Sequence, residues 1–86
     1  MNLNLLLTYS DGTERSITAK AADFVAFEAH FDISIARLQE SMKLTHLFFL
    51  AWNIERRTEA IAKDMTFDKW IDTVEMVQAA EEKKFA

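Results

Sequence analysis

The chain has 86 residues, of which 50% are hydrophobic and 28% are charged, and its formal net charge is −4. This size fits one domain, and the composition excludes a disordered tail and a membrane protein, since the longest apolar run is about half of the ~20 residues that a spanning helix needs. The acidic balance argues against nucleic acid as a partner, and the lack of cysteine excludes disulfides and thiol chemistry.

The first expected element is a β-hairpin over residues 3–19, with two alternating strands around an Asp-Gly turn. A two-residue loop would place apolar residues opposite polar ones. A three-residue loop with Gly12 in the left-handed region instead pairs Leu5 with Ile17. Because register follows the buried face, we expect this bulged turn. Gly12 is the only glycine, which fits a position that needs positive φ.

Helical spacing of apolar residues predicts helices at about 21–31, 35–42, 44–63 and 66–80. Thr66 has the residue type and position of an N-cap for the last helix, whose stripe begins at Phe67 and Trp70. The predicted fold class is α+β, an N-terminal β-hairpin packed on a bundle of three to four α-helices. We expect a single small domain over residues 1–80 and a flexible charged tail over 81–86.

The helix expected at 44–63 is apolar on two sides, one of which is an ordinary core face. The second side is aromatic and continues into charged residues. Either the hairpin and the other helices cover both sides, or the second side is an exposed or half-exposed patch that receives an apolar helix of another protein. Aromatic residues beside arginine are typical of interface hot spots, and a flexible methionine tolerates varied partners. The candidate partner-binding residues are Phe48, Phe49, Trp52, Arg56 and Met76.

Catalytic, cofactor and metal sites are not expected in this sequence. His30 and His46 lie on different predicted helices, without carboxylates at metal-ligand spacing. The serines have no nucleophile-elbow motif around them, and a single glycine excludes a glycine-rich phosphate loop. The sequence therefore favours a protein that is not an enzyme.

Four segments follow one another along the chain, "YSDGTERSI", "DFVAFE", "LTHLFFLAW" with a following arginine, and "TFDKWIDTVEMVQ". In this order they resemble the small tail assembly chaperones of long-tailed bacteriophages, over roughly Leu5 to Gln78. The family's motif residues correspond here to Leu50, Ala51, Trp52, Phe67 and Trp70.

The resemblance implies a protein of the host cell cytoplasm that is absent from the mature virion. Such chaperones bind the tape measure protein, keep it soluble and help the tail tube polymerise around it. A longer form, made by ribosomal frameshifting, would engage the tail tube protein, and Lys83-Lys84 lies where a slippery codon pair would sit. A homo-oligomer is a further candidate partner, and the composition argues against nucleic acid and against a membrane. The start of the chain has no signal-peptide pattern, so we expect it to stay where it is made.

Two other classes of function remain open. A small acidic phage inhibitor that mimics nucleic acid would concentrate its acids on one face, whereas here they are interleaved with lysine and arginine. A structural homodimer module would use the aromatic side only to join two copies. The interface interpretation depends on Phe48, Phe49 and Trp52, because a monomer that encloses all three would remove its support.

Overall fold

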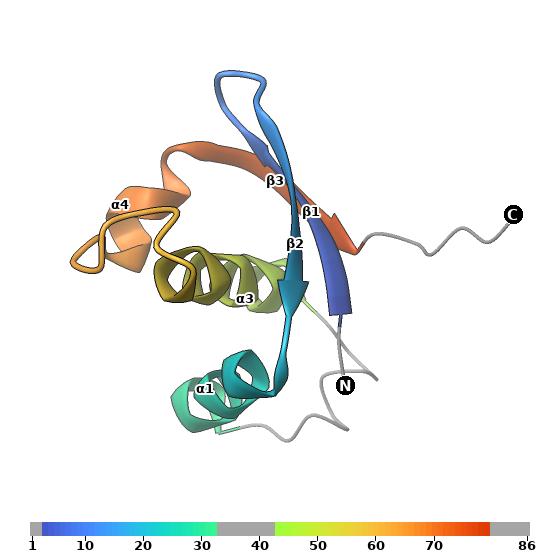
Figure 1. The fold of residues 1–86 in the computed structure, drawn as a ribbon, viewed down its shortest axis with the longest axis vertical. Coiled ribbons are helices and arrows are strands. Elements are labelled where there is room, and N and C mark those ends of the chain that lie inside the picture. The colour runs from blue at the N-terminus through green and yellow to red at the C-terminus, as the bar shows by residue number, and fades with distance from the viewer. Residues whose placement is uncertain (1–2, 33–42, 80–86) are drawn as a thin grey trace, which may run out of the picture.

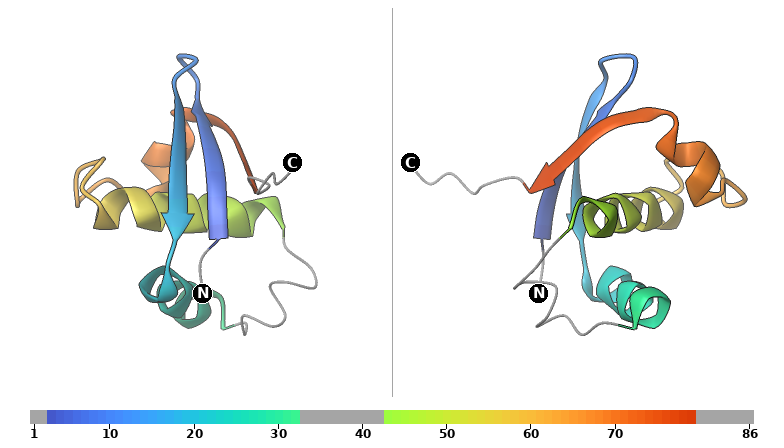
Figure 2. Two further views of the ribbon diagram at one scale, coloured as in Figure 1. Left: turned by 45° about the vertical axis from the view of Figure 1, so that its right-hand side comes forward. Right: turned by 180° about the vertical axis from the view of Figure 1, so that it is seen from behind.

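The structure, a computed structural model, describes residues 3–32 and 43–79, which form a three-stranded antiparallel sheet and three helices. The elements are β1 (Leu3–Tyr9), β2 (Glu14–Ala19), α1 (Ala21–Phe31), α3 (Leu44–Arg57), α4 (Phe67–Ile71) and β3 (Val74–Ala79). Figure 1 shows α3 running across one face of the sheet, with α1 and α4 beside it, and the two further views agree (Figure 2). The α+β class is thus as expected.

The hairpin has the predicted register and turn. Leu5 lies opposite Ile17. The Tyr9 N–H donates to the Thr13 carbonyl at 2.8 Å, and the Gly12 N–H donates to the Tyr9 carbonyl at 2.9 Å. Gly12 has φ of 93°, the left-handed conformation that a bulged three-residue loop requires.

The chain after α4 differs from the prediction. The helix expected over residues 66–80 ends at Ile71, and Val74–Ala79 forms β3, so the sheet has the order β2-β1-β3. β1 is the central strand, and β3 satisfies the backbone groups that the hairpin alone would leave on its open edge. Val77 is buried opposite Leu7, so the apolar spacing that suggested a helix serves a strand here. The predicted hairpin on a helical bundle is therefore not the arrangement observed.

Helix α3 is also shorter than the expected 44–63, because it ends at Arg57. Glu59 has φ of 64° and its N–H donates to the Arg56 carbonyl at 3.1 Å, while the Ala60 N–H donates to the Glu55 carbonyl at 2.9 Å. These two bonds form a Schellman motif, in which a left-handed residue ends the helix. The predicted helix at 35–42 and the predicted tail at 81–86 lie outside the described residues.

The hydrophobic core lies between the sheet and α3 and is closed at its sides by α1 and α4. Its largest fully buried apolar side chains are Trp70, Phe27, Leu5, Leu7, Leu50, Ile54 and Val77. Thr66 caps α4 as predicted, since its hydroxyl accepts the Lys69 N–H at 3.3 Å. Among the described residues, no helix has the length and apolar character to cross a membrane.

Candidate functional site

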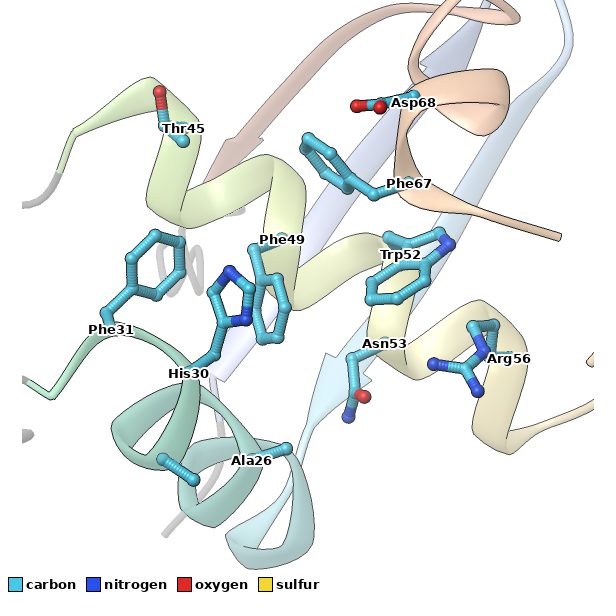
Figure 3. A pocket seen from close by; sticks show the side chains of 11 residues that line it. Ala26, His30, Phe31, Thr45, Phe49, Trp52, Asn53, Arg56, Phe67 and Asp68 are labelled. Atoms are coloured by element: carbon cyan, nitrogen blue, oxygen red, sulfur yellow. The ribbon is translucent and has the colours of Figure 1, made fainter. Parts of the chain in front are cut away.

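A groove of about 690 Å³ lies along the side of α3 that faces away from the sheet, with α1 and α4 on either side of it (Figure 3). We call it the α3 groove. Its floor consists of Thr45, Phe49, Trp52, Asn53 and Arg56 from α3. Its walls are Ala26, Ala29, His30 and Phe31 from α1 and Phe67 and Asp68 from α4. Thr45, Phe49, Trp52 and Arg56 recur every three or four positions because they share one face of the helix, and Asn53 lies beside Trp52 at its edge.

Phe49 forms the middle of the floor and is only 6% exposed. The His30 ring stacks on it with centroids 4.5 Å apart, and the Phe31 ring meets it edge-on at 5.2 Å. Both rings come from the last turn of α1, so they enclose Phe49 rather than leave it open to solvent. Of the two alternatives for the aromatic side, Phe49 therefore follows the one in which other elements of the same chain cover it.

Trp52 is half-buried and connects the floor to α4. Its indole Nε1–H donates to the Met65 carbonyl at 3.1 Å, and its ring lies 5.7 Å from Phe67 in a T-shaped contact. The guanidinium of Arg56 lies 4.6 Å from the centre of the Trp52 ring, a cation–π arrangement. Arg56 Nε also donates to the Lys63 carbonyl at 3.2 Å. These contacts hold the loop between α3 and α4 against the helix.

The two remaining candidates lie elsewhere. Phe48 is half-buried and packs edge-on against Trp70, with centroids 6.3 Å apart, so it belongs to the margin of the core. Met76 is 44% exposed and lies opposite Thr8, next to the buried Val77, so it points to the sheet face away from α3. The α3 groove thus contains Phe49, Trp52 and Arg56 but neither Phe48 nor Met76.

A buried ion pair, which the sequence did not reveal, fixes α1 against α3. The Asp23 carboxylate is fully buried and accepts hydrogen bonds from Arg57 Nη2 at 2.8 Å and from Asn53 Nδ2 at 2.9 Å. It also accepts the Lys20 N–H at 2.8 Å and so caps its own helix. The hydrogen bond to Asp23 raises the pKa of the Arg57 guanidinium, and the charge of Asp23 adds to this against the opposing effect of burial. The sequence contains one indication of this arrangement. Asp23 lies three residues after Lys20, which is the spacing at which an acidic side chain caps the start of its own helix.

A second buried carboxylate joins α3 to the hairpin on the other side of the helix. Glu55 is 1% exposed, accepts the Tyr9 hydroxyl, and has Arg15 Nε 3.3 Å from its Oε2 as an ion pair. Burial, and then the hydrogen bond to Glu55, raise the pKa of the Tyr9 hydroxyl. Both faces of α3 are thereby fixed by polar contacts, and the floor of the groove is preorganised.

The chemistry that the α3 groove offers is binding. Its surface is mainly aromatic and small apolar side chains, with the cation Arg56 at one end and the carboxylate of Asp68 in the α4 wall, and an apolar groove of this kind can receive a helix. In residues 3–32 and 43–79, no group of three or more histidine, cysteine, aspartate or glutamate side chains is arranged to hold a metal ion. No protein-family model, curated protein or solved structure matches the chain.

Proposed function

We propose that the protein is a tail assembly chaperone of a long-tailed bacteriophage, which acts in the host cytoplasm and binds the tape measure protein in the α3 groove. The observation that carries the proposal is an apolar groove, with Phe49 and Trp52 in its floor, in a chain of net charge −4. Such a chain combines a surface for apolar clients with the charge that keeps it in solution. The order of the four sequence segments described above supports the same assignment.

The size of the groove suits an α-helical client. From Thr45 to Arg56 the floor advances eleven residues along α3, which at ~1.5 Å per residue is about 16 Å, or three turns of a bound helix. Ala26 and Ala29 in the wall leave room for a client backbone to approach closely. Many copies on one long tape measure protein would add avidity to contacts that are individually weak.

The bound chaperone would keep the tape measure protein soluble until tail tube subunits polymerise around it, and it would then leave the assembly. A longer frameshifted form would bring the tail tube protein to the client. The short form needs only the groove for its part, and no catalytic group is required.

The test is co-expression with the tape measure protein of a long-tailed phage that carries this gene, followed by measurement of the soluble client. Because Phe49 is enclosed, a charge at that position would disturb the core, so the exposed Ala29 in the wall is the better site. We expect Ala29→Glu to place a charge in the groove and to move the client into the pellet. Ala22→Glu is the matched control, since Ala22 is an exposed residue of α1 that does not line the groove.

Circular dichroism and thermal unfolding of both variants establish that they are folded. If Ala29→Glu retains the client in solution as the wild type does, the groove is not the binding site. If the wild-type protein itself leaves the tape measure protein insoluble, the chaperone function is wrong.

A further inference from the structure

The α3 groove continues into a second, smaller recess at the end of the helix. This recess has a volume of about 270 Å³ and shares Asn53 and Arg56 with the groove. Its remaining lining residues are all charged: Arg57, Glu59 and Lys63. We call it the basic recess. A ligand that follows the floor of the groove past Trp52 therefore meets Arg56 and then enters polar surroundings.

The basic recess carries positive charge in a chain that is acidic as a whole. Three cations, Arg56, Arg57 and Lys63, line it together with one anion, Glu59. The buried Asp23 balances Arg57 at 2.8 Å. Three positive charges less these two negative ones leave one net positive charge, against −4 for the whole chain.

Arg56 is the cation that stands between the two cavities. The ring of Trp52 lies under its guanidinium, and its Nε–H is occupied by the Lys63 carbonyl, so two contacts fix the plane of the group. Within residues 3–32 and 43–79, the ion pairs of the structure join Arg15 to Glu55 and Arg57 to Asp23, and no carboxylate pairs with Arg56. A guanidinium held on an aromatic face keeps its terminal N–H groups for a carboxylate.

We propose that the helix bound by the α3 groove is an amphipathic one with an acidic side chain at one end of its apolar stripe, and that this carboxylate pairs with Arg56. The inference rests on the proposed function and adds the chemistry of the client. The apolar residues of the client lie over Phe49 and Trp52, against Ala29. The floor fixes the spacing, because Arg56 follows Phe49, the first apolar residue of the floor, by seven residues or about 10 Å, so the acid follows the first apolar anchor by about two turns.

The test uses two synthetic helical peptides of about 18 residues, or five turns, that differ at one position. Each carries leucine and alanine at i, i+3 and i+4, and the residue about seven positions after the first leucine is Glu in one peptide and Gln in the other. Calorimetry at low salt measures both dissociation constants. A charge-assisted hydrogen bond at a partly exposed site gives an expected preference of about tenfold for the Glu peptide, falling as salt is added.

Arg56→Gln is expected to bind both peptides equally, while Lys69→Gln, which removes an exposed cation of α4 outside both cavities, keeps the preference. Arg56→Lys, which retains the charge without the fork of donors, is expected to keep a smaller preference. If circular dichroism shows that Arg56→Gln is unfolded, the inference is tested by comparing Arg56→Lys with the wild type. The quantity compared is the preference for the Glu peptide over the Gln peptide.

Equal binding of the two peptides by the wild type would overturn the inference, as would a preference that survives in folded Arg56→Gln. In either case the proposed function still stands if Ala29→Glu releases the tape measure protein. If neither peptide binds and Ala29→Glu has no effect on the client, both the inference and the assignment of the groove fall.

Discussion

Three ionisable side chains, Asp23, His46 and Glu55, are buried in the part of the chain that the structure describes. Each has a partner that offsets the cost of leaving water. Asp23 and Glu55 hold opposite sides of α3, and His46 Nδ1 accepts the Lys43 N–H at 3.2 Å at the start of the same helix. At the scale of single residues, these contacts determine where the floor of the α3 groove lies.

We expect His46 to make the stability of the fold depend on pH. Its ring lies edge-on to Phe27 and Phe31, with centroids 5.1 and 5.0 Å away. Burial, and secondarily the charge of Lys43, lower the pKa of His46 from its ordinary value of 6.5. The unfolded chain therefore binds this proton more readily than the folded one, so stability falls as the pH drops below 6.5 towards the folded pKa. We expect the free energy of unfolding to decrease between about pH 7.5 and pH 5.5.

His46→Gln is the control, because glutamine at this position can still accept the Lys43 N–H but does not titrate. Urea denaturation at the two pH values is expected to show a smaller loss for this variant than for the wild type. Equal losses would mean that carboxylates, and not His46, cause the pH dependence.

At the scale of elements, the end of α3 determines the shape of the groove. The left-handed Glu59 stops the helix, and the loop that follows returns so that the Met65 carbonyl reaches Trp52. This return places Phe67 beside Trp52 as part of the second wall. A helix that continued to residue 63, as the sequence suggested, would have carried the chain past this position.

Glu59→Gly is expected to stabilise the protein by about 0.5–1 kcal/mol, since a residue with a Cβ pays a steric cost in the left-handed conformation. Chemical denaturation measures the gain. Glu59→Ala keeps the Cβ and removes the charge, so a similar gain in that variant would assign the effect to charge instead of backbone conformation.

The sequence was sufficient for elements whose signals are local. Gly12 and the pairing of Leu5 with Ile17 gave the hairpin register, and Thr66 gave the start of α4. β3 was missed because the spacing of Val74 and Val77 fits a helical stripe as well as a strand. The strand forms because it pairs with the open edge of β1, which is distant in the sequence.

The same distinction applies to the candidate site. Phe49, Trp52 and Arg56 were identified together because they share one helix, so their spacing is visible in the sequence. The walls from α1 and α4 depend on tertiary contacts, which include the ion pair of Asp23 with Arg57, and no spacing along the chain reveals them.

At the scale of the whole molecule, four of the nine aromatic residues that the structure describes are buried within one protomer, and the other five are half-buried. Phe49 is covered, whereas Trp52 in the groove and Phe48 outside it remain partly exposed. The most exposed large apolar residues that the structure describes do not line the groove: Val25, Leu44 and Met76. Two half-buried rings of this kind do not make a large dimer interface.

We therefore expect multi-angle light scattering to give the mass of one chain for the protein without client. A constitutive dimer that Ala29→Glu separates and Ala22→Glu does not would instead favour the structural homodimer, with the groove occupied by a second copy.

The order in which the strands are synthesised has a consequence for folding. Leu5 lies opposite Ala79 across the β1–β3 pair, a separation of 74 residues (79 minus 5). β1 is therefore synthesised well before β3, its partner at this edge. A nascent chain that has not yet reached Val74 exposes one flank of β1 together with Leu7. The pairing of β1 with β3 is therefore a late, long-range step in folding. A chain truncated before residue 74 would leave this edge of β1 unpaired, and we expect such a fragment to aggregate.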